Sequence, residues 1–154
     1  MIEGWFDGCC EPKNPGGHAA WGAAVHVDGV SVYREGGYCG FGPKMSNNVA
    51  EYSAFCAVAK ECMRHTGPIW IRGDSKLVVM QITGRWKIHG GFYVPFYQEA
   101  KALWASVRDR ARLTWIPREE NDICDVLSKK VLHDMGVVFR LQPEGVCAQE
   151  AKAK

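Results

Sequence analysis

Four acidic residues stand at positions where an expected strand ends or an expected helix begins. Asp7 ends the first expected strand, and Asp74 follows the short apolar run 69–73, which stops abruptly, as a buried strand does before a helix. Glu51 is expected in the first turn of one helix, and Asp125 lies early in the last expected helix. Ligands of open α/β sheets bind at the carboxyl ends of strands. The four carboxylates are therefore candidates for one site, although Asp74 could instead cap the helix that follows it.

Such a group of carboxylates is electrostatically costly by itself, because neighbouring like charges repel and raise each other's pKa. Divalent cations remove this cost. Mg²⁺ prefers oxygen ligands, binds a few carboxylates and keeps room for the phosphate oxygens of a substrate. The sequence therefore predicts metal-dependent chemistry on a substrate that contains phosphate.

Turn signals and apolar patterns indicate the elements that would position these carboxylates. Residues 2–8, 19–27 and 30–40 are expected to form three consecutive antiparallel strands, the last two joined by the hairpin signal Asp28-Gly29. A helix begins after Ser46 or Asn47 and ends before Gly67-Pro68. The other expected elements are a strand at 69–73, helices at 75–83 and 95–110, a strand at 112–117 and a helix at 121–133. This order predicts an α/β domain, with a mixed sheet covered by helices.

Composition limits the class of protein. The 154 residues suffice for one domain with its own core, and no apolar run is long enough to cross a membrane. The N-terminus does not resemble a signal peptide, so a cytoplasmic protein is expected. The seven cysteines fit neither a disulfide framework nor paired metal knuckles, and we expect mostly reduced thiols. A zinc site built from Cys9, Cys10 and a histidine is the weaker alternative.

The net charge of +2 hides an uneven distribution. Residues 1–59 hold three basic and six acidic side chains, so the positive charge lies in the remainder of the chain. Between positions 85 and 118 two acidic residues face seven basic ones, namely Arg85, Lys87, Lys101, Arg108, Arg110, Arg112 and Arg118. This distribution favours a polyanionic substrate held near metal-binding carboxylates. The alternative is a basic helix face that contacts only solvent.

An ordered set of motifs resembles type 1 ribonuclease H over about residues 1–134. The motifs are Asp7-Gly8-Cys9-Cys10 with Asn14-Pro15-Gly16-Gly17, Ser46-Asn47-Asn48-Val49-Ala50-Glu51-Tyr52, Gly73-Asp74-Ser75, and Ile116-Pro117-Arg118-Glu119 with Asn121, Asp125 and Leu127. The resemblance implies a ribonuclease H-like fold with three antiparallel N-terminal strands plus two parallel strands. We expect this domain to cover residues 1–136 and to be followed by a partly disordered tail at 137–154.

The same resemblance implies an activity. The family cleaves the RNA strand of RNA–DNA hybrids with two Mg²⁺ ions, for which Mn²⁺ can substitute, and leaves 5′-phosphate and 3′-hydroxyl ends. Its catalytic and metal-binding quartet corresponds to Asp7, Glu51, Asp74 and Asp125, with Asp122 as the alternative for the last position. A monomer is expected. The residues implied in substrate binding are Cys10, Asn14, Ser46, Asn47, Asn48, Lys76, Trp86 and Arg118.

Departures from the family pattern are visible. The loop before the last helix lacks the histidine that many members carry, and Arg118 or Glu119 is the candidate replacement. Residues 85–94 are too few for the basic protrusion of many members, which leaves Arg85, Trp86, Lys87 and Lys101 to hold the DNA strand, unless Trp86 only covers the core. Two other readings remain: a nuclease of the same fold, of the integrase or resolvase type, and a noncatalytic nucleic-acid binding module.

Overall fold

The computed structural model describes residues 1–140, and the remainder of the expected tail lies outside the described residues. Five strands form a single sheet: β1 (Ile2–Glu11), β2 (His18–Val27), β3 (Val30–Phe41), β4 (Ile69–Gly73) and β5 (Ala111–Trp115). Their spatial order is β3-β2-β1-β4-β5, in which β1, β2 and β3 pair antiparallel and β4 is parallel to both β1 and β5. The predicted mixed sheet is therefore confirmed.

The β2–β3 hairpin forms where the sequence predicts it. Asp28 and Gly29 adopt positive φ values of 50° and 81°, which suits the short turn. The Asp28 amide donates to the Met1 carbonyl oxygen at 3.0 Å, so the turn is also tied to the start of β1.

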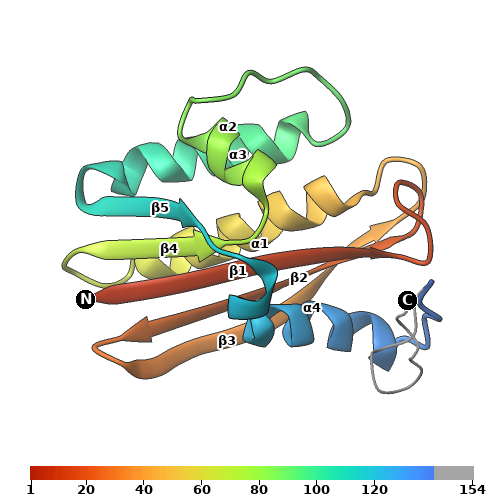
Figure 1. Ribbon diagram of the computed structural model, residues 1–154, viewed down its shortest axis with the longest axis horizontal. Coiled ribbons are helices and arrows are strands. Elements are labelled where there is room, and N and C mark those ends of the chain that lie inside the picture. Colours follow the sequence, from red (N-terminus) through yellow and green to blue (C-terminus); the bar gives the residue numbers. More distant parts are fainter. Residues whose placement is uncertain (141–154) are drawn as a thin grey trace.

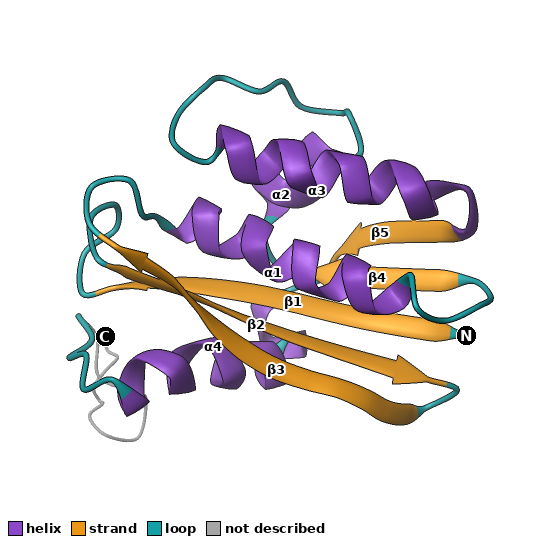
Figure 2. Cartoon of the chain, turned by 180° about the vertical axis from the view of Figure 1, so that it is seen from behind, coloured by secondary structure: helices purple, strands orange, loops and turns teal. Residues whose placement is uncertain are grey.

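Helices cover both faces of the sheet. The first three are α1 (Asn47–Cys62), α2 (Lys76–Ile82) and α3 (Val94–Val107), and the last is α4 (Asp122–Asp134). Short 3₁₀ turns, η1 (Arg108–Arg110) and η2 (Arg118–Glu120), flank β5. In Figure 1 the segment from β5 to α4 crosses in front of β1, whereas Figure 2 shows α1 in front of β1 from the other side. The helix α4 therefore lies on the face opposite α1.

The core lies mainly between the sheet and α1. Phe6 on β1 and Phe55 on α1 are fully buried, and their rings meet edge to face at 5.6 Å between centroids. Glycines let both helices approach the sheet closely. A Cβ on Gly8 would lie 2.5 Å from the Ala50 backbone of α1, and one on Gly22 would lie 2.4 Å from the Cys124 carbonyl oxygen of α4.

Several predicted boundaries differ from the structure. Strand β1 continues through Glu11, because its last residues pair with the start of β2. The helix predicted at 95–110 ends at Val107, and the chain continues as the turn η1. Glu51 lies beyond the first turn of α1, so its predicted position in that turn was wrong. Strand β5 covers residues 111–115, one residue earlier at its start and two earlier at its end than predicted.

The described part of the expected tail packs against the domain. Val137 and Phe139 contact a small cluster around Leu132 on the α4 side of the sheet. The Arg140 guanidinium forms an ion pair with Glu11 at 3.0 Å. Within residues 1–140 the six cysteines are free, and no helix has both the length and the apolar character needed to span a membrane.

Candidate active site

Three of the four predicted carboxylates meet at the carboxyl end of β4. Asp7 comes from β1, Glu51 from α1 and Asp74 from the residue after β4, and one oxygen of each lies within 4.8 Å of the others. Asp7 and Glu51 are each 5 % exposed, and the Asp74 side chain is 6 % exposed. Such a buried group of oxygens can hold a divalent cation.

Backbone geometry aims each carboxylate. Asp7 is the central member of β1, and its Oδ1 accepts a hydrogen bond from the Gly8 amide at 2.9 Å. Because Gly8 has no side chain, α1 can pack close to β1, and this places Glu51 beside Asp7. Helix α2 is capped by Ser75, whose Oγ accepts from the Val78 amide at 3.2 Å. The capping alternative for Asp74 is therefore wrong, and its carboxylate is free to face Asp7.

The electrostatics of the site favour protons or cations. Burial, followed by the negative charges of Asp74 and Asp125, raises the pKa of Asp7 to about 8. Burial and the charges of Asp7 and Asp74 hold the pKa of Glu51 well above its usual value. The protein without metal therefore retains protons among these carboxylates at neutral pH.

The residues present fit Mg²⁺ or a similar hard cation. All three groups supply oxygen ligands, as Mg²⁺ prefers. Within residues 1–140, the buried Oε1 of Glu51 has no hydrogen-bond partner, which leaves it available to a cation.

Asp125 lies near the group but outside it. Its charge acts on Asp7, yet its side chain is 31 % exposed and forms an ion pair with Lys129 at 3.2 Å. The alternative, Asp122, is exposed and is not among the residues whose charge acts on Asp7. The structure therefore places Asp125, rather than Asp122, beside the carboxylate group.

A cationic side chain flanks Asp74. The Arg118 Nε lies 3.7 Å from Asp74 Oδ2, and the Arg118 side chain is 84 % exposed. The Trp115 indole N–H donates to the Asp74 carbonyl oxygen at 3.1 Å, and the Lys76 ammonium lies 5.7 Å from the centroid of the Trp115 ring. Two predicted substrate-binding cations, Lys76 and Arg118, thus stand at the edge of the site.

Four of the residues expected to bind substrate lie where the β1–β2 loop meets the start of α1. The Asn14 Oδ1 accepts from the Asn47 amide at 2.9 Å, and the Ser46 Oγ accepts from the Val49 amide at 3.2 Å as the N-cap of α1. Asn48 follows on the first turn of α1 and is partly exposed. These four residues therefore form one polar edge beside Glu51.

Cys10 differs from the other expected contact residues. It packs against Ala19 and Ala50, is 1 % exposed, and its thiol donates to the Lys13 carbonyl oxygen at 3.2 Å. Alternation along β1 turns this side chain toward α1. Its thiol is therefore not presented to a bound hybrid, contrary to the expectation.

The loop between α2 and α3 carries only part of the expected basic cluster. Trp86 is 43 % exposed, and Arg85 and Lys87 are exposed beside it. Lys101 instead donates to the Ile82 carbonyl oxygen at 2.8 Å, at the end of α2. The exposed basic surface of this loop therefore consists of Arg85 and Lys87 around Trp86.

Sequence reasoning gave Asn121 no role beyond its place in a motif. Asn121 is 2 % exposed, and its Nδ2 donates to the Phe6 carbonyl oxygen at 2.8 Å. This bond ties the start of α4 to β1, next to Asp7. The only sequence signal was an Asn at the start of the last expected helix, which also fits an ordinary N-cap.

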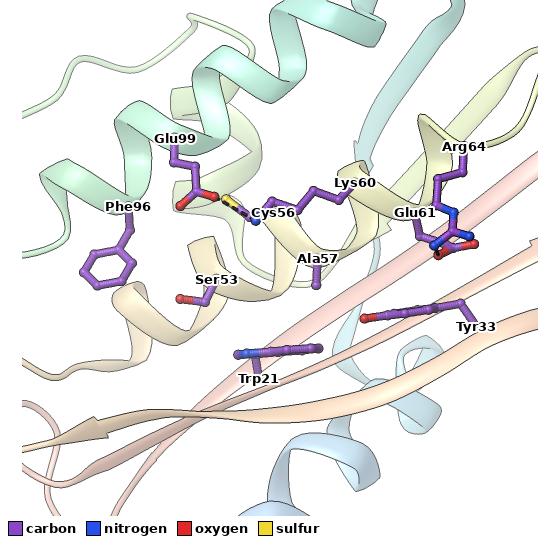
Figure 3. Close-up of a pocket in the computed structure, with 10 residues that line it drawn as sticks. All are labelled: Trp21, Tyr33, Ser53, Cys56, Ala57, Lys60, Glu61, Arg64, Phe96 and Glu99. Carbon is purple, nitrogen blue, oxygen red and sulfur yellow. Dashed lines mark ion pairs between the residues drawn. The ribbon is translucent and has the colours of Figure 1, made fainter.

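A cavity lies away from the carboxylates. It has a volume of about 460 Å³ between α1, α3 and strands β2 and β3, with Trp21 and Tyr33 on the sheet side (Figure 3). Its charged residues pair with each other, Lys60 with Glu99 at 3.0 Å and Arg64 with Glu61 at 4.0 Å. It therefore offers no unpaired charge for a phosphate.

Comparison with known proteins points to one group. Residues 6–131 match a sequence family described as reverse transcriptase-like. Ribonuclease HI of Halobacterium salinarum is 33 % identical over 135 residues, which are 86 % of this chain and 65 % of that protein. A bifunctional protein of Mycobacterium tuberculosis is 32 % identical over 120 residues, 77 % of this chain and 32 % of its own length. The chain thus spans less than two thirds of the length of these relatives.

Solved structures share the fold. The crystal structure of the Halobacterium salinarum RNase H1 matches with a TM-score of 0.75 and 30 % identity, covering 86 % of this chain and 98 % of that one. LC11-RNase H1, solved in complex with an RNA/DNA hybrid, matches with a TM-score of 0.77 and 22 % identity over 88 % of this chain and 99 % of its own.

Proposed function

Because the chain belongs to the reverse transcriptase-like family and its solved relatives include ribonucleases H, we propose that it hydrolyses the RNA strand of RNA–DNA hybrids. The observation that carries the proposal is the group of buried oxygens from Asp7, Glu51 and Asp74 within 4.8 Å of one another. A surface that only bound nucleic acid would gain nothing from acidic groups that repel phosphates.

In this proposal, Asp7, Glu51 and Asp74 hold two Mg²⁺ ions, for which Mn²⁺ can substitute, and Asp125 completes the set from α4. Bound metal would supply an activated water and charge neutralisation at the leaving 3′-oxygen, giving 5′-phosphate and 3′-hydroxyl products. The chain's own carboxylates give up their shared protons when the cations bind, because the cations remove the repulsion that raises their pKa.

The remaining residues orient the hybrid. Asn14, Asn47 and Asn48 offer amide groups on one edge of the site, which suits the 2′-hydroxyls that an RNA strand displays in the minor groove. Arg118 lies close enough to Asp74 to contact a scissile phosphate, and its exposed side chain can turn toward the substrate. All these residues come from one chain, so a monomer suffices.

A substrate panel tests the proposal. The purified protein with Mg²⁺ is given labelled RNA–DNA hybrid, duplex DNA, duplex RNA and single-stranded RNA of one sequence. We expect cleavage of the RNA strand in the hybrid. The downstream product should carry a 5′-phosphate, so that a ligase joins it without prior phosphorylation. Preferential cleavage of duplex DNA would indicate the integrase or resolvase type instead. Binding of the hybrid without cleavage at any Mg²⁺ or Mn²⁺ concentration would indicate a noncatalytic module.

A further inference from the structure

Arg140, the last described residue, binds the end of β1. Its guanidinium forms a fork with Glu11, in which Nε lies 3.0 Å from Oε1 and Nη2 lies 3.3 Å from Oε2. The same Nη2 donates to the Cys10 carbonyl oxygen at 2.9 Å, and the Arg140 amide donates to Glu11 Oε1 at 3.0 Å. Such forked, charge-assisted bonds are strong, and they fix direction as well as distance. Arg140 therefore fixes both the Glu11 side chain, which is 15 % exposed, and the backbone before it.

The residues just before Arg140 hold it in this place. Val137 and Phe139 pack against a cluster that includes Leu132. The Phe139 ring also stacks on the His133 ring, with 4.3 Å between the ring centroids. Figure 1 shows the end of the described chain beside the loop that joins β1 to β2. Because packing already holds the backbone that carries Arg140, less conformational entropy opposes its ion pair than opposes a pair between two mobile side chains.

Glu11 lies at the base of the loop that joins β1 to β2, residues 12–17. This loop folds back tightly on its own base. A Cβ on Gly17 would lie 2.6 Å from the Glu11 carbonyl oxygen and 2.5 Å from the Lys13 carbonyl oxygen. Only glycine permits so close an approach of one backbone segment to another. A shift of Glu11 would therefore displace the loop.

The other side of this loop contacts the segment that leads into α1. The Gly16 amide donates to the Met45 carbonyl oxygen at 2.9 Å, and the Asn14 Oδ1 accepts from the Asn47 amide at 2.9 Å. The second bond uses the side-chain oxygen of Asn14, so its NH₂ group is the part that can donate to a substrate. The loop is therefore held at its base by the Arg140–Glu11 pair and at its tip by the start of α1.

We propose that Arg140 is a positioning residue for the substrate: through Glu11 it orders the loop 12–17 and so orients the Asn14 amide toward the hybrid. The inference rests on the proposed function, in which Asn14 binds the hybrid. A loop that is ordered before the hybrid arrives loses less conformational entropy on binding, so the effect belongs to KM rather than to kcat. Arg140 does not contact the substrate in this role, since its charge is neutralised by Glu11.

The sign of the effect of Glu11→Ala separates positioning from direct phosphate binding by Arg140. If Arg140 bound a phosphate, Glu11→Ala would free the guanidinium and remove a charge that repels phosphate, so KM for the hybrid would fall. Positioning predicts that KM rises about fivefold in Glu11→Ala and in Arg140→Ala, the effect of losing about one hydrogen bond to the hybrid. Because both changes break one contact, the double variant should have the same KM as either single variant, and kcat should stay nearly unchanged in all three.

Lys130→Ala is the matched control. Lys130 also pairs with a carboxylate, that of Asp134 at 2.6 Å, but both residues belong to α4 and neither contacts β1 through this pair. The variant removes the same charge as Arg140→Ala and should leave KM near the wild-type value. Urea unfolding of each variant confirms that KM is measured on folded protein. An equal rise of KM in Lys130→Ala and Arg140→Ala would indicate a general effect of charge and overturn the inference.

Amide hydrogen exchange in the free protein measures the order of the loop independently of cleavage. The Gly16 and Asn47 amides, which hold the loop to the start of α1, should exchange faster in Glu11→Ala and Arg140→Ala than in wild type and Lys130→Ala. Unchanged exchange at both amides, or a KM that is unchanged or lower in Glu11→Ala, overturns this inference alone when the wild type cleaves the hybrid. A folded wild type that neither binds nor cleaves the hybrid overturns the proposed function, and this inference with it.

Discussion

Removal of the Asp7 charge should change how the stability of the metal-free protein depends on pH. Asp7 is 5 % exposed, and its pKa is raised from 3.8 to about 8, first by burial and then by Asp74 and Asp125. Between these values the folded state keeps a proton that the unfolded state has released, so the free energy of unfolding falls as the pH rises. From pH 5 to pH 8 the contribution of Asp7 to this loss amounts to at most about 4 kcal/mol, at about 1.4 kcal/mol for each pH unit.

Asp7→Asn cannot lose this proton, so its free energy of unfolding should vary less over the same range, and the slope that remains should come from Glu51, whose pKa is also raised. The measurement is urea unfolding with a metal chelator at several pH values between 5 and 8, for wild type, Asp7→Asn and the control Asp109→Asn, whose replaced side chain is fully exposed. Mg²⁺ should restore stability to the wild type near pH 8, because it binds only the folded carboxylate group. A wild-type stability that is flat or rises from pH 5 to pH 8, or a slope unchanged in Asp7→Asn, would refute the reasoning.

Three further predictions concern substrate binding and local structure. Arg85→Ala with Lys87→Ala should raise KM for a hybrid and leave kcat nearly unchanged. The slope of log K for hybrid binding against log salt concentration should become shallower by up to about two units. An unchanged KM and an unchanged slope would place the DNA strand elsewhere. Ser46→Ala removes the cap bond to Val49 and should lower the free energy of unfolding by about 1 kcal/mol, measured by urea denaturation, whereas Ser46→Asp should restore it. Gly8→Ala places a Cβ 2.5 Å from the Ala50 backbone and should displace α1, with a loss of both stability and Mg²⁺ affinity; wild-type Mg²⁺ affinity in this variant would contradict the role of close packing at Gly8.

Local sequence signals predicted the elements well where turn chemistry is distinctive. Asp28-Gly29 closes its hairpin as expected, and the apolar run before Asp74 is a buried strand. Where a helix continues into a 3₁₀ turn, as at Arg108–Arg110, the local pattern is helical on both sides of the boundary, so the end at Val107 could not be read from it. The spatial strand order depends on packing between distant segments, which a local pattern does not contain.

The site could be predicted in part for a similar reason. The position of Asp74 at the end of a strand is visible in the chain, whereas Asp7, expected at a strand end, lies in the middle of β1. The burial of Glu51 depends on how closely α1 approaches Gly8. The burial of the Cys10 side chain was not predicted, because β1 extends farther along the chain than its apolar pattern indicates. Asn121 could not be identified as the link between α4 and β1, because its partner is a backbone oxygen 115 residues earlier.

Hydrolysis of a labelled RNA–DNA hybrid by Asp74→Asn, beside wild type and Asp109→Asn, tests the central claim most directly. Asp74 contributes one of the three oxygens of the carboxylate group and does not cap α2, so its replacement should leave folding and hybrid binding largely intact. The proposal predicts that single-turnover cleavage in Mg²⁺ is abolished in Asp74→Asn, while Asp109→Asn cleaves like wild type and all three proteins bind the hybrid with similar Kd. Near-normal cleavage by folded Asp74→Asn would contradict the claim that these carboxylates form the catalytic site.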